Sequence, residues 1–407
     1  MKKTLNQSYP KGTFQYAFSN LLERSSFYGI RALLTLYMVK SFLKMEDVEA
    51  AKIYSVFTIS VILSQFIGAI VGDLLIGNKK AIITGMLLQA CGAFCINLPY
   101  KEAFFISLFL IAIGGGLYSP NLISSFGKLY YDKTKLLDSG LTILYLIPKA
   151  GSFIAPLAIG FIGIKFGWQP GFITCGIIAL LSLILFLTIK IERNEKVVSQ
   201  QPSINNRTVN IVIIFILVGL FWVIYGIASF QSNYILNQFN QITTIFSFEE
   251  LWSTGSLLLT IPLSIIAIFL WKKFYSRPFF KLMTGAILVM ISFGLLYMIP
   301  EYPNELHFLF YGISVICLNV SQIYIAPVLH SVIFQYSKPK FFTILISFAS
   351  IPTSLLSIIV TYFGSDLYES TSTQILIGLT AITGLSVGII YIYLLRNRNQ
   401  KSQIEYL

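Results

Sequence analysis

The sequence carries little charge, and charge is what keeps the surface of a soluble protein in water. Only 11% of its 407 residues are Asp, Glu, Lys or Arg, whereas an ordinary soluble domain has about 25%. Hydrophobic residues make up 56% of the chain, and the mean hydropathy is +0.76. This balance excludes a soluble globular domain and indicates a protein with many membrane spans.

Clustered basic residues and paired cysteines are also missing. The formal net charge is +12, but Lys and Arg fall in short loops between apolar stretches, so we expect no nucleic-acid partner. The four cysteines lie inside apolar stretches, with no CxxC pattern and no nearby histidine. They are therefore predicted to be packing residues, without a disulfide or a metal site.

Motifs of enzyme chemistry are absent from the sequence as well. It has no GxSxG nucleophile elbow, no HExxH zinc motif and no P-loop lysine pattern, so we expect neither an enzyme nor an ATP-driven pump, and no cofactor. The first residues, MKKTLNQSYPKGTFQ, have a basic start but no apolar region before a cleavage site, so no removable signal peptide is expected.

Long apolar runs, in contrast, occur throughout the chain. Counting runs of about 20 apolar residues predicts an all-α membrane protein with twelve transmembrane helices. The expected spans are 14–40, 51–76, 80–98, 103–127, 137–163, 169–190, 209–237, 250–271, 278–299, 306–335, 341–364 and 373–395. One set of loops and the two termini hold 21 Lys and Arg, and the opposite loops hold 5, which predicts that both termini are cytoplasmic.

A polar stretch, IERNEKVVSQQPSINNRTVN, follows the sixth expected span. It predicts an N-terminal six-helix bundle in residues 1–190, a cytoplasmic linker in 191–209 and a C-terminal six-helix bundle in 210–407. This layout resembles the major facilitator fold, in which two halves rock around a central cavity at mid-membrane.

The loop after the second expected span reads GDLLIGNKKA. Gly72 and Gly77 permit a tight reversal, and Asp73 is placed to cap or pair with a neighbouring helix end. The loop resembles the signature that joins the second and third helices of major facilitator proteins. An ordinary positively charged loop is the alternative.

Within the first expected span, the stretch FSNLLERSSFYGIRALLTLYMV contains a glutamate and two arginines. A charge at mid-bilayer costs roughly 2.5–3.5 kcal/mol, so these residues need a polar environment. Three- and four-residue spacing puts six side chains on one side of a helix, facing the bundle interior or a watery cavity. They are Asn20, Glu23, Arg24, Phe27, Tyr28 and Arg31. A structural ion pair of Glu23 with Arg24 or Arg31 is the alternative.

The run NLLERSSFYGIR resembles the first-helix motif of the proton-dependent oligopeptide transporters, ExxER followed by an aromatic pair, a glycine and an arginine. GGGLYSPNLISSFGKLY and DSGLTILYLIPKAGSFIAPL resemble the motifs of the fourth and fifth helices of this family. Their glycines and prolines favour close helix packing and local unwinding. The resemblance covers most of residues 15–171 and is weaker in FWVIYGI, FFKLMTG and IYIAPVLHSV of the second half.

Several charged positions of the family are changed in this chain. Asn20 replaces the first glutamate of ExxER, Ser119 replaces a lysine, and Lys149 replaces an asparagine. In the second half, Gly226 and Gln322 stand where the family has glutamates. We hypothesise that Lys149 takes over as the cationic partner of Glu23 or of an anionic substrate. The charged residues expected deep within the membrane then all lie in the first half. We expect no Asp, Glu, Lys or Arg deep within the spans of the second half.

The resemblance implies a secondary transporter in the plasma membrane, which takes up di- and tripeptides or peptide-like carboxylates by proton-coupled alternating access. Its partners are a small-molecule substrate, protons and the lipid bilayer, and we expect a monomer. Glu23 and Arg31 are assigned to proton coupling or gating. The expected substrate-binding residues are Arg24, Tyr28, Arg31, Tyr118, Tyr145, Lys149, Trp222, Gln322 and Tyr324.

Two alternatives remain open at this point. A major facilitator carrier or exporter of another small anionic solute would explain the changed charges, because Arg24, Arg31 and Lys149 outnumber Glu23. A membrane sensor or scaffold that transports nothing is the second alternative.

Overall fold

The computed structural model describes residues 2–3, 8–41, 43–189, 204–242, 248–275, 278–300, 303–304, 307–349, 351 and 371–405. The chain divides into two compact units. We call Gln7–Gln201 with Ser337–Phe348 the N-terminal unit. The C-terminal unit comprises Met1–Asn6, Pro202–Tyr336 and Ala349–Leu407. The expected linker in 191–209 lies mostly outside the described residues.

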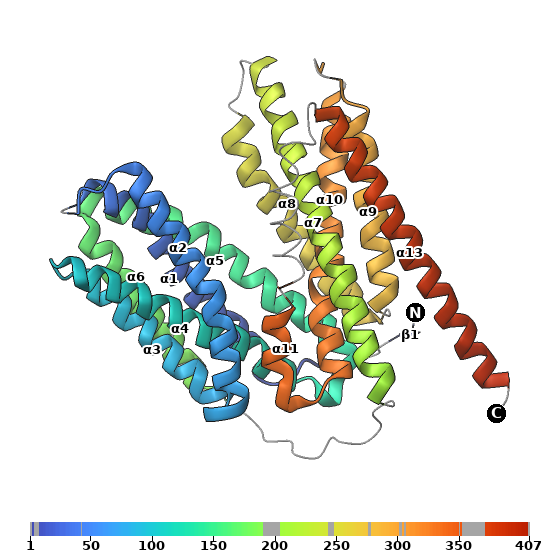
Figure 1. The fold of residues 1–407 in the computed structure, drawn as a ribbon, viewed down its shortest axis with the longest axis horizontal. Helices are drawn as coiled ribbons and strands as arrows, with labels where there is room; N and C mark the ends of the chain where they lie inside the picture. The colour runs from blue at the N-terminus through green and yellow to red at the C-terminus, as the bar shows by residue number, and fades with distance from the viewer. Residues whose placement is uncertain are drawn as a thin grey trace. The chain divides into compact units, whose positions relative to one another are not determined.

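The N-terminal unit is a helical bundle in which α11, from late in the sequence, packs against α2 and α4 (Figure 1). α1 packs on α5 and α6, and α4 packs on α2 and α3. Its helices are α1 (Thr13–Lys40), α2 (Asp47–Ile70), the π-helix η1 (Val71–Ile76), α3 (Asn78–Cys95), α4 (Lys101–Lys128), the 3-10 helix η2 (Tyr131–Leu136), α5 (Leu137–Phe166), α6 (Trp168–Leu187), the 3-10 helix η3 (Pro339–Phe341) and α11 (Phe342–Phe348).

The C-terminal unit is helical too, with α10 packed on α7, α8 and α9, and α13 packed on α7 and α9. Its helices are α7 (Ile204–Ile242), α8 (Phe248–Lys273), α9 (Pro278–Tyr297), α10 (His307–Tyr336) and α13 (Thr371–Glu405). Two short strands, β1 (Lys2–Lys3) and β2 (Phe274–Tyr275), pair antiparallel.

Glycines allow the helices of the N-terminal unit to approach closely, as the motif GGGLYSPN predicted. A Cβ placed on Gly114 of α4 would lie 2.6 Å from the backbone oxygen of Gly85 on α3. A Cβ placed on Gly151 of α5 would lie 2.5 Å from Ser25 Oγ on α1. Since real Cβ atoms do not approach neighbours this closely, larger residues at these positions would push the helices apart.

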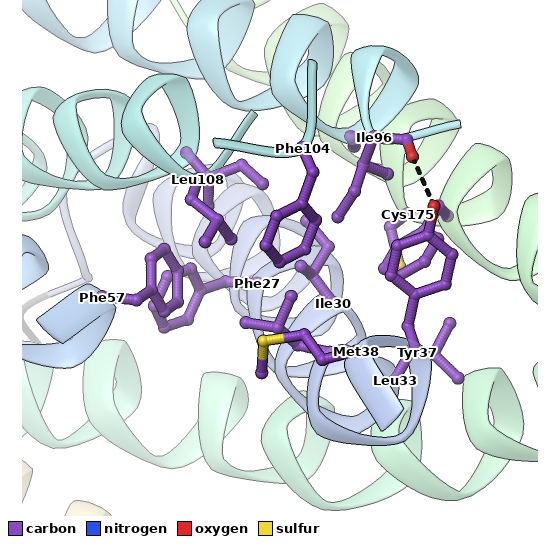
Figure 2. Close-up of a cluster of buried hydrophobic side chains, with 14 of the residues drawn as sticks. Phe27, Ile30, Leu33, Tyr37, Met38, Phe57, Ile96, Phe104, Leu108 and Cys175 are labelled. Carbon is purple, nitrogen blue, oxygen red and sulfur yellow. Dashed lines mark hydrogen bonds between the residues drawn. The ribbon is translucent and has the colours of Figure 1, made fainter. Parts of the chain in front are cut away.

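A hydrophobic cluster joins α1, α2, α4 and α6 and holds α1 in place (Figure 2). Phe27 and Ile30 of α1 are buried with Phe57 of α2 and Phe104 of α4. At one end of the cluster, the Tyr37 hydroxyl donates a hydrogen bond of 3.1 Å to the carbonyl of Ile96, drawn as a dashed line in Figure 2. This packing fixes the register of α1, the helix that carries Glu23, Arg24 and Arg31.

Eight helical segments among the described residues are long and apolar enough to cross a membrane. They are Asp47–Ile76, Lys101–Lys128, Tyr131–Phe166, Trp168–Leu187, Ile211–Leu236, Pro278–Tyr297, His307–Tyr336 and Thr373–Leu394. Helices α1, α3 and α8 also coincide with expected spans, but they are not in this set. Of the expected span 341–364, the structure describes α11 and little beyond it. Twelve spans and cytoplasmic termini therefore remain predictions.

Candidate functional site

Glu23 is the centre of a buried polar cluster in the N-terminal unit. Its side chain is 1% exposed, and its Oε2 lies 3.2 Å from Nε of Arg24, the next residue on α1. Of the two ion pairs considered from the sequence, the structure therefore forms the one with Arg24. A buried carboxylate is stable only when it is paired or hydrogen-bonded, and Arg24 supplies the opposite charge.

Gln89 on α3 is the second partner of Glu23, and the sequence analysis missed it. Its Nε2 donates a hydrogen bond of 3.1 Å to Glu23 Oε1. Gln89 is fully buried, so this contact lies inside the bundle. In the sequence, Gln89 stands out only as an amide residue within the apolar stretch of α3. Such a residue is expected to make a buried hydrogen bond, but the sequence does not show with which residue.

Arg24 connects α1 to α4 through one of the changed family positions. Its terminal guanidinium nitrogen donates a hydrogen bond of 2.7 Å to Ser119 Oγ. The uncharged Ser119 therefore accepts a hydrogen bond from Arg24. A lysine at this position would place a second positive charge beside Arg24. Asn20, the other changed position nearby, donates a hydrogen bond of 3.4 Å to the Leu144 carbonyl on α5.

Arg31 lies about two helical turns beyond Arg24 on α1 and is surrounded by aromatic rings. Its Nε donates a hydrogen bond of 2.8 Å to the Tyr54 hydroxyl on α2. Its guanidinium carbon is 5.2 Å from the Tyr54 ring centre and 5.9 Å from that of Tyr28. Aromatic faces attract a guanidinium, so these rings hold Arg31 in place.

The other first-half residues predicted to bind substrate lie on α4 and α5. Tyr118 on α4 is fully buried. Tyr145 and Lys149 on α5 are half-buried. Glu23 is paired with Arg24 and Gln89, and the role of Lys149 stays a prediction.

The second-half candidates lie in the C-terminal unit on α7 and α10. Trp222 is half-buried and packs edge-on against Tyr225, with ring centres 5.4 Å apart. Tyr324 packs edge-on against Trp271 of α8 at 5.6 Å. Gln322, next to Ser321 on α10, is half-buried, and Gly226 is exposed.

One basic residue that was counted with the loops is buried. Lys281 is among the 21 Lys and Arg that the sequence analysis counted in one set of loops and the termini. The structure places Lys281 in the first turn of α9 with 1% exposure. Its Nζ lies 4.3 Å from the ring centre of Trp271, so the aromatic face covers the ammonium group. The position of Lys281 near the start of a helix could not predict this contact, because Trp271 belongs to a different helix.

The GDLLIGNKKA loop makes a specific contact inside the N-terminal unit. Asp73 Oδ2 accepts a hydrogen bond of 3.0 Å from the backbone nitrogen of Ile344, in the first turn of α11. Its Oδ1 accepts one of 2.5 Å from the Thr343 hydroxyl. A carboxylate stabilises a helix start by accepting from unpaired backbone N–H groups. Gly77 ends the loop with a left-handed φ of 84°, which favours glycine.

The sequence model of the Major Facilitator Superfamily matches residues 16–327, which is most of the chain. The chain belongs to the major facilitator superfamily. The fold of a solved superfamily protein, a proton:xylose symporter, agrees, with a TM-score of 0.67 at 15% identity over 92% of this chain and 94% of that one.

Among the curated relatives of this superfamily protein are transporters of bacteria. A di-/tripeptide transporter of Lactococcus lactis is 28% identical over 252 residues, 58% of this chain and 50% of the relative. Dipeptide and tripeptide permease B of Salmonella typhimurium is 27% identical over 247 residues, 59% and 50% of the two chains. An uncharacterized transporter of Bacillus subtilis, YclF, is 33% identical over 183 residues, 44% and 37% of the chains.

The matched segments thus span half or less of the curated relatives. A solved structure of an oligopeptide-family transporter in complex with 5-aminolevulinic acid has a TM-score of 0.59 at 20% identity, over 94% of this chain and 96% of that one, and agrees in fold. The first-half motifs resemble those of the oligopeptide transporters, and the curated relatives that match include transporters of di- and tripeptides.

Proposed function

We propose that this chain is a secondary transporter that moves di- and tripeptides, or peptide-like carboxylates, by proton-coupled alternating access. The observation that carries the proposal is the buried pair of Glu23 and Arg24, whose arginine also reaches Ser119. A membrane protein retains a buried ion pair at a high cost, so such a pair marks a functional site.

In this proposal Glu23 is the proton carrier. As a carboxylate it binds Arg24 by charge. A proton taken from water neutralises it, and the attraction that holds Arg24 is then lost. The freed guanidinium, with its planar set of N–H donors, is suited to a carboxylate of the substrate. Substrate binding and proton binding thereby favour each other.

Arg31 and Lys149 add positive charge on the same half, which favours a substrate with a free carboxylate. Tyr28, Tyr118 and Tyr145 supply aromatic surface and hydroxyl groups. Trp222, Gln322 and Tyr324 are assigned to the rest of the substrate, where Gln322 accepts a hydrogen bond from an ammonium group. The relatives that transport di- and tripeptides support a peptide as this substrate.

The same proposal includes the architecture that the sequence predicts. Two six-helix halves, joined by the linker 191–209, form twelve spans with both termini in the cytoplasm. The protein works as a monomer in the plasma membrane and uses protons without a bound cofactor.

Uptake into proteoliposomes tests the proposal. We expect a radiolabelled dipeptide to accumulate when the outside is acidic, and the same dipeptide with an amidated C-terminus to accumulate far less, since it lacks the carboxylate. Dipeptide uptake at a rate that does not depend on the proton gradient would contradict proton coupling. Equal uptake of the amidated peptide would contradict carboxylate recognition, and binding without flux would indicate a sensor.

A further inference from the structure

We propose that Gln89 is a positioning residue that holds Glu23 in both its charged and its protonated form. The inference rests on the proposed proton-coupled function and goes beyond it by assigning a residue on α3. Gln89 accomplishes this by rotating its side-chain amide, so that it presents a donor to one form of Glu23 and an acceptor to the other.

The side-chain amide of Gln89 can face Glu23 in either of two orientations. Gln89 Nε2 donates to Glu23 Oε1 at 3.1 Å. Its own Oε1 is buried and has no hydrogen-bond partner among the residues that the structure describes. A buried acceptor without a partner costs free energy, so such atoms call for an explanation. Half a turn about the terminal side-chain torsion exchanges the positions of Nε2 and Oε1.

The exchange matches the two states of the carboxyl group. An ionised carboxylate only accepts hydrogen bonds, so it requires Nε2. When a proton from water joins Glu23 Oε1, the new O–H group donates, and it requires Oε1 of the rotated amide. No covalent bond of Gln89 changes, and the proton stays on Glu23. The acceptor that lacks a partner in the described structure therefore finds one in the protonated state.

Glycines on α4 provide the space for this side chain. A Cβ placed on Gly114 would lie 2.8 Å from Gln89 Cγ, which is too close. A Cβ placed on Gly115 would lie 3.9 Å from Gln89 Nε2, at ordinary contact distance. The GGG run thus lets Gln89 reach across to α1, and it leaves room beside the amide.

Several other charged and titratable groups lie on the helices packed against α1. α1 itself carries Arg24, and its neighbours carry Tyr54, Tyr118, Tyr145, Lys149 and Cys175, together with the carboxyl groups of Asp47, Glu49, Glu102 and Asp138. A pH response of transport is therefore assigned to Glu23 only where it is lost in a Glu23→Gln variant.

Gln89→Met in the reconstituted full chain tests the inference, because methionine has about the size of glutamine but no donor and only a weak acceptor. We expect peptide exchange at equal pH on both sides to persist. Gradient-driven uptake should fall about tenfold, the factor that corresponds to one hydrogen bond to a charged group, and the midpoint of its pH profile should move by about one unit. Gln65→Met on α2 is the matched control and should behave as wild type.

Three outcomes distinguish the possible failures. Wild-type protein without gradient-driven uptake would overturn the proposed function and this inference with it. Wild-type uptake together with an unchanged pH profile in Gln89→Met would overturn the inference alone. In a Glu23→Gln background, where only peptide exchange remains, Gln89→Met should leave the exchange rate unchanged, and a further change would contradict action through Glu23. If Gln89→Met does not fold, Gln89→Asn serves instead, since its amide is one methylene too short for the contact.

Discussion

Neighbouring glycines on α4 should respond in opposite ways to the same substitution. Gly114→Ala places a Cβ 2.6 Å from the Gly85 backbone oxygen, about 0.8 Å inside the 3.4 Å at which ordinary contact begins. Gly115→Ala places a Cβ no closer than 3.9 Å to any neighbour outside its own helix. The two variants add the same methyl group to the same helix, one residue apart.

The magnitudes follow from these distances. Overpacking costs about 1–3 kcal/mol, and contact with backbone, which cannot swing away, puts Gly114→Ala at the upper end. Alanine recovers about 1 kcal/mol of helix propensity, so the net loss is about 2 kcal/mol. Gly115→Ala causes no overpacking, so it should gain the same helix propensity, about 1 kcal/mol, without a cost. At roughly 2–4 °C per kcal/mol, Tm falls by about 4–8 °C for Gly114→Ala and rises by about 2–4 °C for Gly115→Ala.

Thermal unfolding of the purified variants in detergent, followed by intrinsic fluorescence, measures both shifts in one experiment. Shifts of the same sign and size would refute the close approach of α3 and α4, because the argument depends entirely on the different space at the two positions.

Three further substitutions test other contacts. Asp73→Ala removes the acceptor at the start of α11 and should lower the free energy of unfolding by about 1–3 kcal/mol, seen as a lower Tm; a Tm equal to wild type would contradict the capping contact. Tyr54→Phe keeps the ring beside Arg31 but removes its hydroxyl, so we expect KM for a dipeptide to change about two- to tenfold with little change in Tm; no change in KM would remove Arg31 from the substrate site. Lys149→Ala should weaken uptake of substrates with a free carboxylate about tenfold or more, and intact binding and transport would end the hypothesis that Lys149 is a cationic partner.

The local features of the fold were largely predictable from the sequence. Apolar runs of the right length predicted where the long helices lie, because a helix in lipid must satisfy its own backbone and show an apolar surface. The glycines of GGGLYSPN predicted close packing, and Gly114 lies against Gly85 of α3. The charged stripe on α1 predicted a polar environment, and Glu23 is buried with Arg24 in one.

Contacts between distant segments were not predictable. The sequence indicated that Asp73 would meet a helix end, but not that the helix would be α11, 270 residues further along the chain. Gln89 and Tyr54 were missed for the same reason: periodicity tells which face of a helix is polar, and not which helix faces it. The burial of Lys281 depends on the Trp271 ring, which belongs to another helix.

Proton movement caused by the peptide itself tests the central claim most directly. In liposomes that contain a pH-sensitive dye, we expect addition of a dipeptide outside to acidify the interior when the wild-type chain is present. Glu23→Gln cannot carry the proton and should abolish this acidification while it still exchanges labelled peptide. Acidification by Glu23→Gln at the wild-type rate, or peptide entry without acidification in wild type, would contradict a proton-coupled transporter in which Glu23 carries the proton.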